Sequence, residues 1–242
     1  MIYIGTSGYN YYHWKDVFYP AELNSKDFFS YYQKYFNTVE INYSFYHFPK
    51  ESTVEKWYKN SKEDFFYSLK VPKGITHLKK LKNCNQELTS FINVAKHLKE
   101  KLGVILFQLP PSFHFTEENL SRLKEILPLL PPEIRFAIEF RHKSWFTLES
   151  ELDFLKGTNL TVVVVSAPKI PFKVYENSKL IYIRLHGKDR WYSYDYSEEE
   201  LKEIANIITE NKGKIKEFWI YFNNDFGGFA VKNAIRLKEM VD

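Results

Sequence analysis

The sequence predicts a single α/β domain over residues 1–242, with the architecture of a (β/α)8 TIM-barrel-like fold. Short runs of β-branched and aromatic residues alternate with longer amphipathic segments from end to end, which is typical of βα units. Eight such units in 242 residues match the length of about 250 residues that is usual for these barrels. Runs such as Val104–Phe107 and Val162–Val165 are apolar on both faces, as expected for strands between a packed interior and covering helices. No linker or change of composition divides the chain.

Eight segments are predicted as strands because β-branched and aromatic residues dominate them. They are Ile2–Thr6, Thr38–Asn42, Phe65–Val71, Val104–Leu109, Ile134–Phe140, Leu160–Val165, Leu180–His186 and Glu217–Phe222. Seven segments are predicted as helices because their apolar residues recur three and four positions apart. They are Ser25–Phe36, Thr53–Asn60, Asn85–Lys101, Glu117–Leu127, Leu148–Lys156, Glu198–Asn211 and Gly228–Met240.

Three of these helices have recognisable starts. Asn24 or Ser25 is predicted to cap the first, and Thr116 the fourth, where acidic residues face the positive helix end. Ser197, followed three residues later by a glutamate, has the spacing of a capping box. After the sixth strand, the prolines in 167–172 disfavour a helix, so an irregular connection is expected there.

Composition sets limits on partners and location. The formal net charge is +4 with a pI of about 8.8, which neither requires nor excludes nucleic acid. The single cysteine, Cys84, forms no intrachain disulfide, and no charged and apolar leader follows Met1, so cytoplasmic residence is expected. No apolar run reaches the roughly 18 to 20 residues that span a bilayer, and no membrane association is expected. The sequence leaves the oligomeric state open.

Most predicted strands end in a polar or ionisable residue rather than in a neutral turn. If the strands are parallel, these side chains converge on one face, which is where α/β proteins bind their ligands. The residues predicted to contact a substrate there are Thr6, Ser7, Asn42, Tyr46, Lys70, His77, Gln108, Arg141, His142, Trp145, Arg184, Trp191, Tyr194, Asn223 and Asn224.

Ionisable groups among these strand ends are candidates for proton transfer. The candidate catalytic residues are Glu40, Glu139, His186 and Asp225. Alternation along 39–46 places Glu40, Asn42 and Ser44 on one side of a strand. Glu139 likewise shares a side with Arg141. A glutamate inside a strand either pairs with a cation or serves a site, and the sequence leaves both readings open.

Metal and cofactor use stay unknown at this level. The seven histidines form no His-x-x-x-His or Glu-x-x-His pair, and no cysteine cluster assists them. A divalent metal held between separate strand ends, for instance by Glu139 and His186, stays open without a local motif to support it.

Cations and aromatic residues gather at the same strand ends. Lys70, Arg141 and Arg184 favour an anionic ligand, either a small molecule or a nucleic acid. Trp191 and Tyr194 supply surfaces on which bases stack, whereas Trp145 suits a core anchor equally well.

Ordered motifs along nearly the whole chain resemble the YecE-like family of unknown function. They are Gly5-Thr6-Ser7-Gly8-Tyr9, Val39-Glu40-Ile41-Asn42 with Ser44-Phe45-Tyr46, Thr76-His77, Phe107-Gln108-Leu109-Pro110-Pro111, Glu139-Phe140-Arg141-His142 with Ser144-Trp145, Arg184-Leu185-His186-Gly187 and Phe222-Asn223-Asn224-Asp225. The resemblance implies a TIM-barrel-like fold with these motifs at its C-terminal mouth, and it implies no particular reaction. Where many relatives have an aspartate after the sixth strand, this chain has Ser166, which weakens any mechanism that needs a carboxylate there.

Three functions compete on this evidence. The first is a hydrolase or lyase acting on a phosphate-containing or nucleic-acid-like substrate, with Glu40 or Glu139 as base and Arg141, Arg184 and His77 holding the anion. Distant fold analogy to metal-dependent apurinic-site endonucleases is an associative argument for it. The second is a carbohydrate-active enzyme with two carboxylates. The third is a noncatalytic module that binds a nucleotide or single-stranded nucleic acid.

Overall fold

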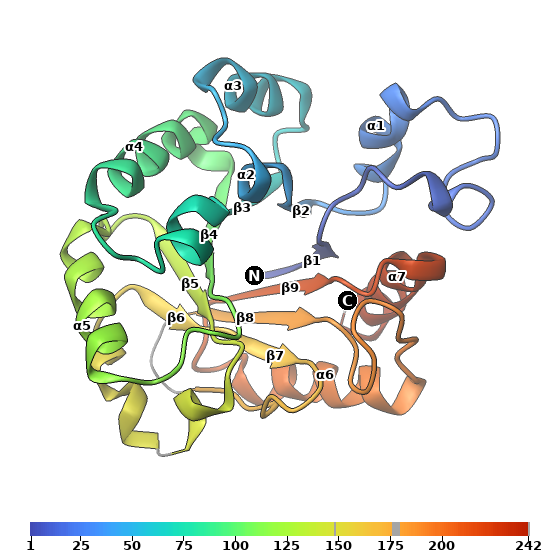
Figure 1. Cartoon of the computed structure of the whole chain (residues 1–242). Coiled ribbons are helices and arrows are strands. Elements are labelled where there is room, and N and C mark those ends of the chain that lie inside the picture. Colours follow the sequence, from blue (N-terminus) through green and yellow to red (C-terminus); the bar gives the residue numbers. More distant parts are fainter. Residues whose placement is uncertain (148, 176–179, 242) are drawn as a thin grey trace.

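Parallel β-strands form the centre of the molecule in the computed structural model, which describes residues 1–147, 149–175 and 180–241 (Figure 1). The strands are β1 Ile2–Thr6, β2 Thr38–Ile41, β3 Phe66–Lys70, β4 Leu102–Gln108, β5 Arg135–Glu139, β6 Leu160–Val162, β7 Val164–Ser166, β8 Leu180–Leu185 and β9 Glu217–Phe222. All eight predicted strands are confirmed to within two residues at each end, and the sixth is divided at Val163 into β6 and β7.

The strands form two parallel sheets, in the orders β1-β9-β8-β7 and β2-β3-β4-β5-β6. Val163 connects them at one junction, and its amide donates to the carbonyl oxygen of Ile138 at 2.9 Å. At the other junction, Ser7 and Glu40 form one isolated parallel bridge between the ends of β1 and β2. The result is a single α/β domain with parallel sheets, and its hydrogen bonding does not confirm a closed barrel.

The junction between β1 and β2 depends on a tyrosine and a glycine. The Tyr32 hydroxyl accepts a hydrogen bond from the Thr6 amide at 2.9 Å and donates one to the Thr38 carbonyl oxygen at 3.0 Å. A Cβ at Gly5 would lie 2.3 Å from that same carbonyl oxygen. The side chain of Tyr32 therefore replaces ladder hydrogen bonds where the strands approach closely.

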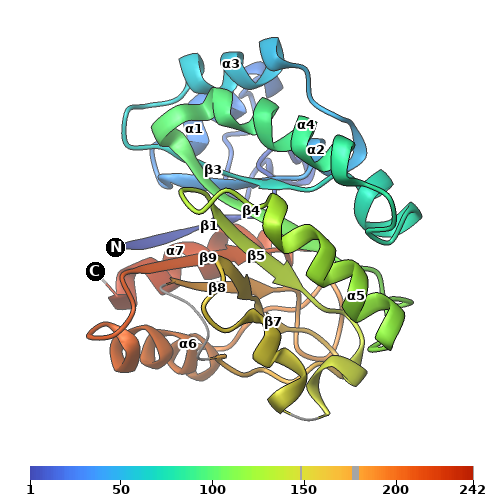
Figure 2. The same cartoon turned by 90° about the vertical axis from the view of Figure 1, so that its left-hand side faces the viewer.

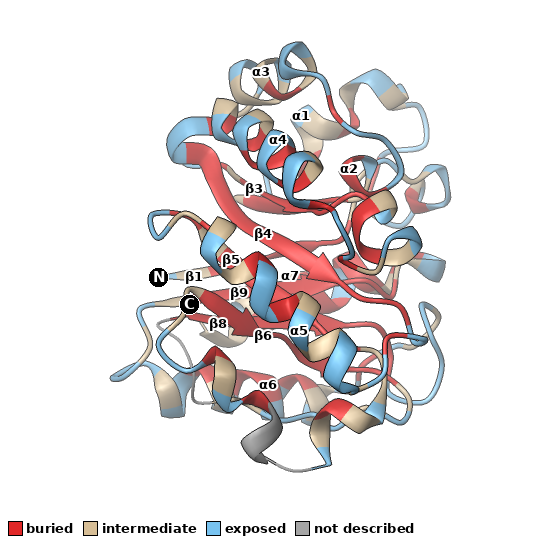
Figure 3. Ribbon diagram, turned by 60° about the vertical axis from the view of Figure 1, so that its left-hand side comes forward, coloured by how far each residue is buried: buried red, intermediate tan, exposed pale blue. Residues whose placement is uncertain are grey.

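Strands are buried on both faces, as their apolar composition predicts. One cluster of side chains lies between the two sheets and includes Tyr3, Leu106, Val165, Tyr182 and Trp219. A larger cluster lies between the sheets and the surrounding helices. Figure 3 shows the strands buried along their length, while the helices are buried along one side and exposed along the other.

Helices cover the outside of the sheets, as the two views in Figures 1 and 2 show. They are α1 Phe28–Tyr32, α2 Tyr43–Tyr46, α3 Glu51–Asn60, α4 Asn85–Ala95, α5 Glu117–Ile126, α6 Glu198–Asn211 and α7 Phe229–Val241. The predicted helix 25–36 begins with a 3-10 turn and ends at Tyr32, and the predicted helix 85–101 continues as a 3-10 helix over Lys96–Lys101.

The predicted helix 148–156 is a 3-10 helix over Glu149–Leu155, and Leu148 lies outside the described residues. Its buried residues Leu152 and Leu155 are three positions apart, a spacing that fits three residues per turn as well as an α-helix. Residues 167–170 form bends and a turn, and 171–175 have no regular secondary structure, which confirms the irregular connection expected after the sixth strand.

Two of the three predicted caps are confirmed. The Thr116 hydroxyl accepts from the Asn119 amide at 3.2 Å, and Ser197 with Glu200 forms a capping box. Asn24 precedes the 3-10 turn Ser25–Asp27 but makes no side-chain cap hydrogen bond, and Ser25 lies inside that turn rather than at its cap. In the three ranges described, no helix has the length and apolar character needed to cross a membrane.

Candidate functional site

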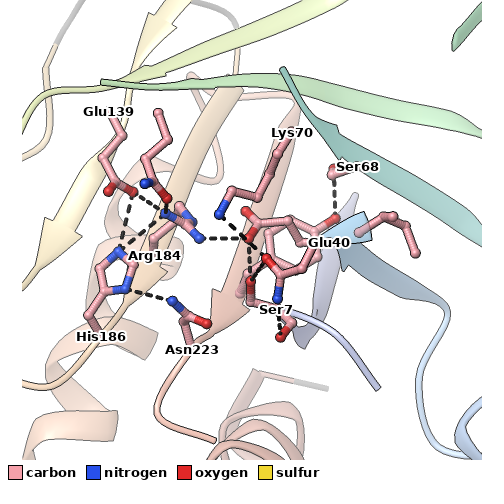
Figure 4. Close-up of polar contacts among 12 residues, drawn as sticks. Ser7, Glu40, Ser68, Lys70, Glu139, Arg184, His186 and Asn223 are labelled. Carbon is pink, nitrogen blue, oxygen red and sulfur yellow. Dashed lines mark hydrogen bonds and ion pairs between the residues drawn. The ribbon is translucent and has the colours of Figure 1, made fainter. Parts of the chain in front are cut away.

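The ends of the strands bring a charged network together around Arg184, which is fully buried (Figure 4). Its Nη2 donates to Oε1 of Glu40 at 2.7 Å, and its Nη1 donates to Oε2 of Glu139 and to Oε1 of Gln108, the latter at 3.1 Å. One guanidinium therefore joins β2, β4 and β5 to β8. Within the described part of the chain, Nε of Arg184 is buried without a hydrogen-bond partner.

Glu40 is held from three directions. Besides Arg184, its Oε1 accepts from the Ser7 hydroxyl at 2.5 Å, and its Oε2 accepts from the Tyr182 hydroxyl at 2.8 Å. Burial alone would raise the pKa of Glu40, but the charges of Arg184 and Lys70 outweigh it, so the pKa lies below its usual value. Glu40 is thus an ionised and fully bonded carboxylate.

Both carboxylate oxygens of Glu139 also accept hydrogen bonds. Its Oε1 accepts from Nε of Arg141 at 2.5 Å, and its Oε2 accepts from Nε2 of His186 at 3.3 Å in addition to Arg184. Burial opposes ionisation, yet the two arginine charges hold the pKa of Glu139 well below its usual range. Burial lowers the pKa of His186 to about 4, so the ring is neutral at pH 7 while Asn223 donates to its Nδ1 at 2.9 Å.

Lys70 ends β3 beside this network and is 6% exposed. Its Nζ lies 3.4 Å from Oδ1 of Asn42 and 4.5 Å from the centre of the Phe45 ring. Burial and the charges of Arg184 and Arg141 lower the pKa of Lys70 to about 7, against the opposing effect of the nearby glutamates. Lys70 is therefore neutral far more often at pH 7 than an exposed lysine is.

A partly exposed rim surrounds these groups. The guanidinium of Arg141 lies 4.9 Å from the centre of the Trp191 ring, which is 36% exposed, and its Nη1 donates to the Tyr192 hydroxyl at 3.4 Å. Across the site, His77 packs against Phe45 at 5.0 Å, and burial together with the Arg141 and Lys70 charges lowers the pKa of His77 to about 4.

A cavity of about 410 Å³ adjoins Asn42. Its lining includes Tyr9, Tyr11, Tyr43 and Trp57, so its walls are largely aromatic. The Tyr11 hydroxyl donates to the carbonyl oxygen of Ser7 at 2.7 Å, which connects this cavity to the charged network.

The structure thus gathers ten of the predicted residues in one connected set. They are Ser7, Glu40, Asn42, Lys70, Gln108, Glu139, Arg141, Arg184, His186 and Asn223. His77 and Trp191 contact its edge, and Tyr46, 60% exposed, lies beyond Phe45.

Other predicted residues have different surroundings. Trp145 is fully buried and donates to the Phe113 carbonyl oxygen at 2.7 Å, which is the position of a core anchor. His142 caps a 3-10 helix by accepting from the Ser144 amide at 3.2 Å, and Thr6 belongs to the β1–β2 junction. Tyr194 donates to Glu200 on α6.

Asn224 and Asp225 belong to the loop after β9 rather than to the network. Asn224 is buried and donates to the Tyr194 carbonyl oxygen at 2.7 Å, which fixes that loop. Asp225 pairs with His13, with Oδ2 3.8 Å from Nε2, and burial raises its pKa. Among the candidate acid and base groups, Asp225 is therefore the one outside the Arg184 network.

The contact between Tyr182 and Glu40 was not predicted from the sequence. Tyr182 was detectable, because it precedes Arg184 and His186 at the strand period of two and so shares their face. Ser44 does not continue the alternation of Glu40, since it lies in α2. Tyr11 and Tyr192 come from loops, for which period-two reasoning gives no direction.

A metal site assembled from separate strand ends lacks a complete ligand set in the described ranges. No three His, Cys, Asp or Glu side chains are grouped there in a way that could hold a metal ion. Glu139 and His186 do meet, as the sequence allowed, but they contact each other directly.

Comparison with known proteins finds full-length relatives. A protein called YunF from Bacillus subtilis is 28% identical over all of this chain and 95% of its own length, and YecE from Escherichia coli is 32% identical over half of this chain and 43% of its own length. A crystal structure of a DUF72 family protein from Thermotoga maritima has a TM-score of 0.91 and 32% identity, covering 100% of this chain and 99% of that one.

The family model described as "Protein of unknown function DUF72" matches residues 3–242. The resemblance to YecE-like proteins is therefore confirmed, and the matched region contains the complete polar network around Arg184. The chain belongs to the DUF72 family.

Proposed function

We propose that the polar network and its rim bind the phosphate of an anionic substrate, and that the protein is a hydrolase or lyase acting on phosphate-containing or nucleic-acid-like molecules. The observation that carries this proposal is the position of Lys70. Arg184 and Arg141 match the charges of Glu40 and Glu139, whereas Lys70 has no ion pair to a carboxylate among the described residues. A phosphate at the strand ends would supply the missing negative charge.

Electrostatics support the same conclusion. The pKa values of Lys70 and His77 are lowered to about 7 and about 4, first by burial and then by neighbouring positive charges that include Arg141. The cations near Lys70 and His77 oppose their protonation, against the charges of Glu40 and Glu139, and these cations would attract an anion. Binding of the anion should in turn favour protonation of Lys70.

The aromatic surroundings favour a substrate with a planar part. Trp191 and Tyr192 flank Arg141 at the rim, and the aromatic cavity beside Asn42 is large enough for a ring. Base-aromatic stacking contributes roughly 1 to 3 kcal/mol per base, so either surface suits a nucleotide.

A carbohydrate-active enzyme has less support. Glycoside hydrolysis needs a carboxylic acid with a raised pKa, and the pKa values of Glu40 and Glu139 are both lowered. The pKa of Asp225 is raised, but Asp225 lies outside the network of these two glutamates. Both carboxylates also contact the same guanidinium. We therefore assign these glutamates to positioning Arg184 rather than to proton transfer.

Calorimetric titration with inorganic phosphate, pyrophosphate and a nucleoside 5′-monophosphate tests the proposal. Arg141→Met and Lys70→Met should weaken binding at least about tenfold, because each removes a charge-assisted contact of roughly 1.5 to 3 kcal/mol. Lys73→Met is the matched control, since Lys73 is an exposed lysine near the same rim. At pH 8, wild type should take up protons on binding, and Lys70→Met should not.

Affinities that are equal in Arg141→Met, Lys70→Met and wild type would refute the anion site. Phosphate release or elimination products from the bound ligands separate an enzyme from a binding module. Binding that weakens with salt, without any turnover, would favour the noncatalytic alternative.

A further inference from the structure

The amine of Lys70 has surroundings that differ from those of a structural lysine. A buried lysine that stabilises a fold normally pairs with a carboxylate. Here the oxygens of Glu40 and Glu139 are occupied by arginine, hydroxyl and imidazole donors. Among the described residues, Nζ of Lys70 has one long hydrogen bond, to Asn42 at 3.4 Å. Figure 4 shows this side chain extending into the polar network.

The backbone of Lys70 is fixed from a neighbouring element. The Ser44 hydroxyl on α2 accepts from the Lys70 amide at 3.0 Å and lies 2.8 Å from the Lys70 carbonyl oxygen. Phe45 follows on the same helix and places its ring 4.5 Å from Nζ. Ser44 therefore fixes the backbone at the end of β3, and Phe45 gives the amine an apolar neighbour. Together these two residues of α2 hold the amine in place before a ligand binds.

We propose that Lys70 forms a Schiff base with an aldehyde or ketone carbonyl of a phosphate-bearing substrate, whose phosphate Arg141 binds. The inference rests on the proposed function, which it deepens by naming the reactive group and the substrate class. An amine activated by an apolar wall and neighbouring cations is the usual arrangement for this chemistry. Arg184, Arg141, Glu40 and Glu139 are the charged groups that act on Lys70.

The reaction needs no oxidant or metal to balance. The nitrogen lone pair attacks the carbonyl carbon, a C–N bond forms, and the C=O electron pair moves to oxygen, which takes a proton as nitrogen loses one. The resulting hydroxyl takes a proton from solvent and leaves as water, so a protonated imine remains. That cation accepts the electron pair of the bond between the neighbouring carbon and a hydroxyl-bearing carbon beyond it. Solvent takes the hydroxyl proton, so the distal fragment leaves as an aldehyde, which is the step a lyase requires. Solvent then protonates the resulting enamine carbon, and hydrolysis of the imine regenerates Lys70.

Pyridoxal 5′-phosphate and 5-deoxypyridoxal are the probes, because both carry a free aldehyde that cannot close to an internal hemiacetal and they differ in the phosphate. The protein is incubated with each at pH 7, reduced with cyanoborohydride, and analysed by intact mass and peptide mapping. We expect one adduct, at Lys70, forming at least tenfold faster with the phosphate-bearing probe. An amine with a pKa near 7 has about a thousand times more neutral form at pH 7 than an exposed lysine.

Two substitutions at Lys70 and one control distinguish imine formation by Lys70 from the effect of its positive charge. Lys70→Arg retains a cation but forms no imine, so it should still bind inorganic phosphate and lose the adduct. Lys70→Met should lose the adduct as well, and Lys73→Met should keep it at the wild-type rate. The wild-type rate of adduct formation should increase with pH around an apparent pKa near 7.

Different experimental results would refute the Schiff base at Lys70 and the phosphate-bearing substrate class. If inorganic phosphate binds but peptide mapping finds no adduct at Lys70, the Schiff base is refuted and the anion site stands. If Lys70 reacts equally fast with both probes and inorganic phosphate does not bind, the phosphate-bearing substrate class is refuted. Labelling distributed over surface lysines refutes the special reactivity of Lys70.

Discussion

Removal of Arg184 is the most severe test of the network. Arg184→Met leaves Glu40 and Glu139, both fully buried, without the guanidinium that contacts them. Breaking one buried pair costs roughly 3 to 5 kcal/mol, and here two carboxylates lose a partner together. Because domains unfold at a cost of about 5 to 15 kcal/mol, the substitution should remove a large part of the free energy of unfolding. Urea denaturation followed by tryptophan fluorescence measures the loss.

The pH dependence of that loss has a definite sign. In wild type, the lowered pKa values of Glu40 and Glu139 give stability that is present above the unfolded carboxyl pKa of about 4.3 and is lost as pH falls below it. In Arg184→Met, burial should raise the folded pKa values above about 4.3. The loss of unfolding free energy caused by Arg184→Met should therefore be largest at pH 7 and become smaller as pH falls toward 5.

Arg236→Met is the matched control. Arg236 also contacts two carboxylates, those of Glu198 and Glu239, but it is an exposed residue on α7. Exposed pairs of this kind contribute little, so the control should lose far less stability. If the triple variant Glu40→Gln, Glu139→Gln, Arg184→Met is no more stable than Arg184→Met, unpaired charge is not the cause. Equal losses in Arg184→Met and Arg236→Met would also refute the reasoning.

Three further substitutions have expected outcomes. Tyr182→Phe should cost roughly 1 to 3 kcal/mol in urea denaturation, because it removes a donor from buried Glu40, and a neutral result would contradict that hydrogen bond. Lys70→Met should raise the free energy of unfolding by up to about 4 kcal/mol at pH 7 and by less at pH 9.5, since a lowered pKa costs wild type stability as pH falls from about 10.4 to 7. Gly5→Ala should lower the melting temperature, at a cost of roughly 1 to 3 kcal/mol, because its methyl group would lie 2.3 Å from a carbonyl oxygen of β2. Gly213→Ala, where a Cβ meets nothing within 4 Å, should have little effect.

Strand positions could be predicted because local composition determines them. Strands buried on both faces need continuous apolar runs, and β4, with all seven residues buried, has that composition. The alternation of side chains then predicted which polar residues at the strand ends share a face, as Glu139 and Arg141 do. Convergence on one site followed from the parallel direction of the strands.

The partners within the site could not be predicted in the same way. Arg184 bonds to Glu40 and Glu139 across 144 and 45 residues of sequence, and no local pattern identifies such contacts. The contact of Ser44 could not be predicted either, because Ser44 lies in α2, directly after β2, where strand alternation no longer determines the direction of side chains. Its hydroxyl contacts the backbone of Lys70. Of the two readings that the sequence left open for Glu40, the structure shows the ion pair with Arg184, and a role in ligand binding is part of the proposed function.

The buried amine of Lys70 should lower the stability of the fold, whereas the proposed phosphate binding requires it. An apolar side chain such as methionine would suit its buried position beside Phe45, whereas the amine must lose water without gaining a carboxylate. We therefore expect the fold not to depend on this amine, in contrast to Arg184, whose guanidinium joins β2, β4 and β5 to β8. A Lys70→Met protein that is more stable than wild type and has lost phosphate affinity would show that the amine serves the ligand. Loss of both properties would instead place Lys70 with Arg184 in the structural network.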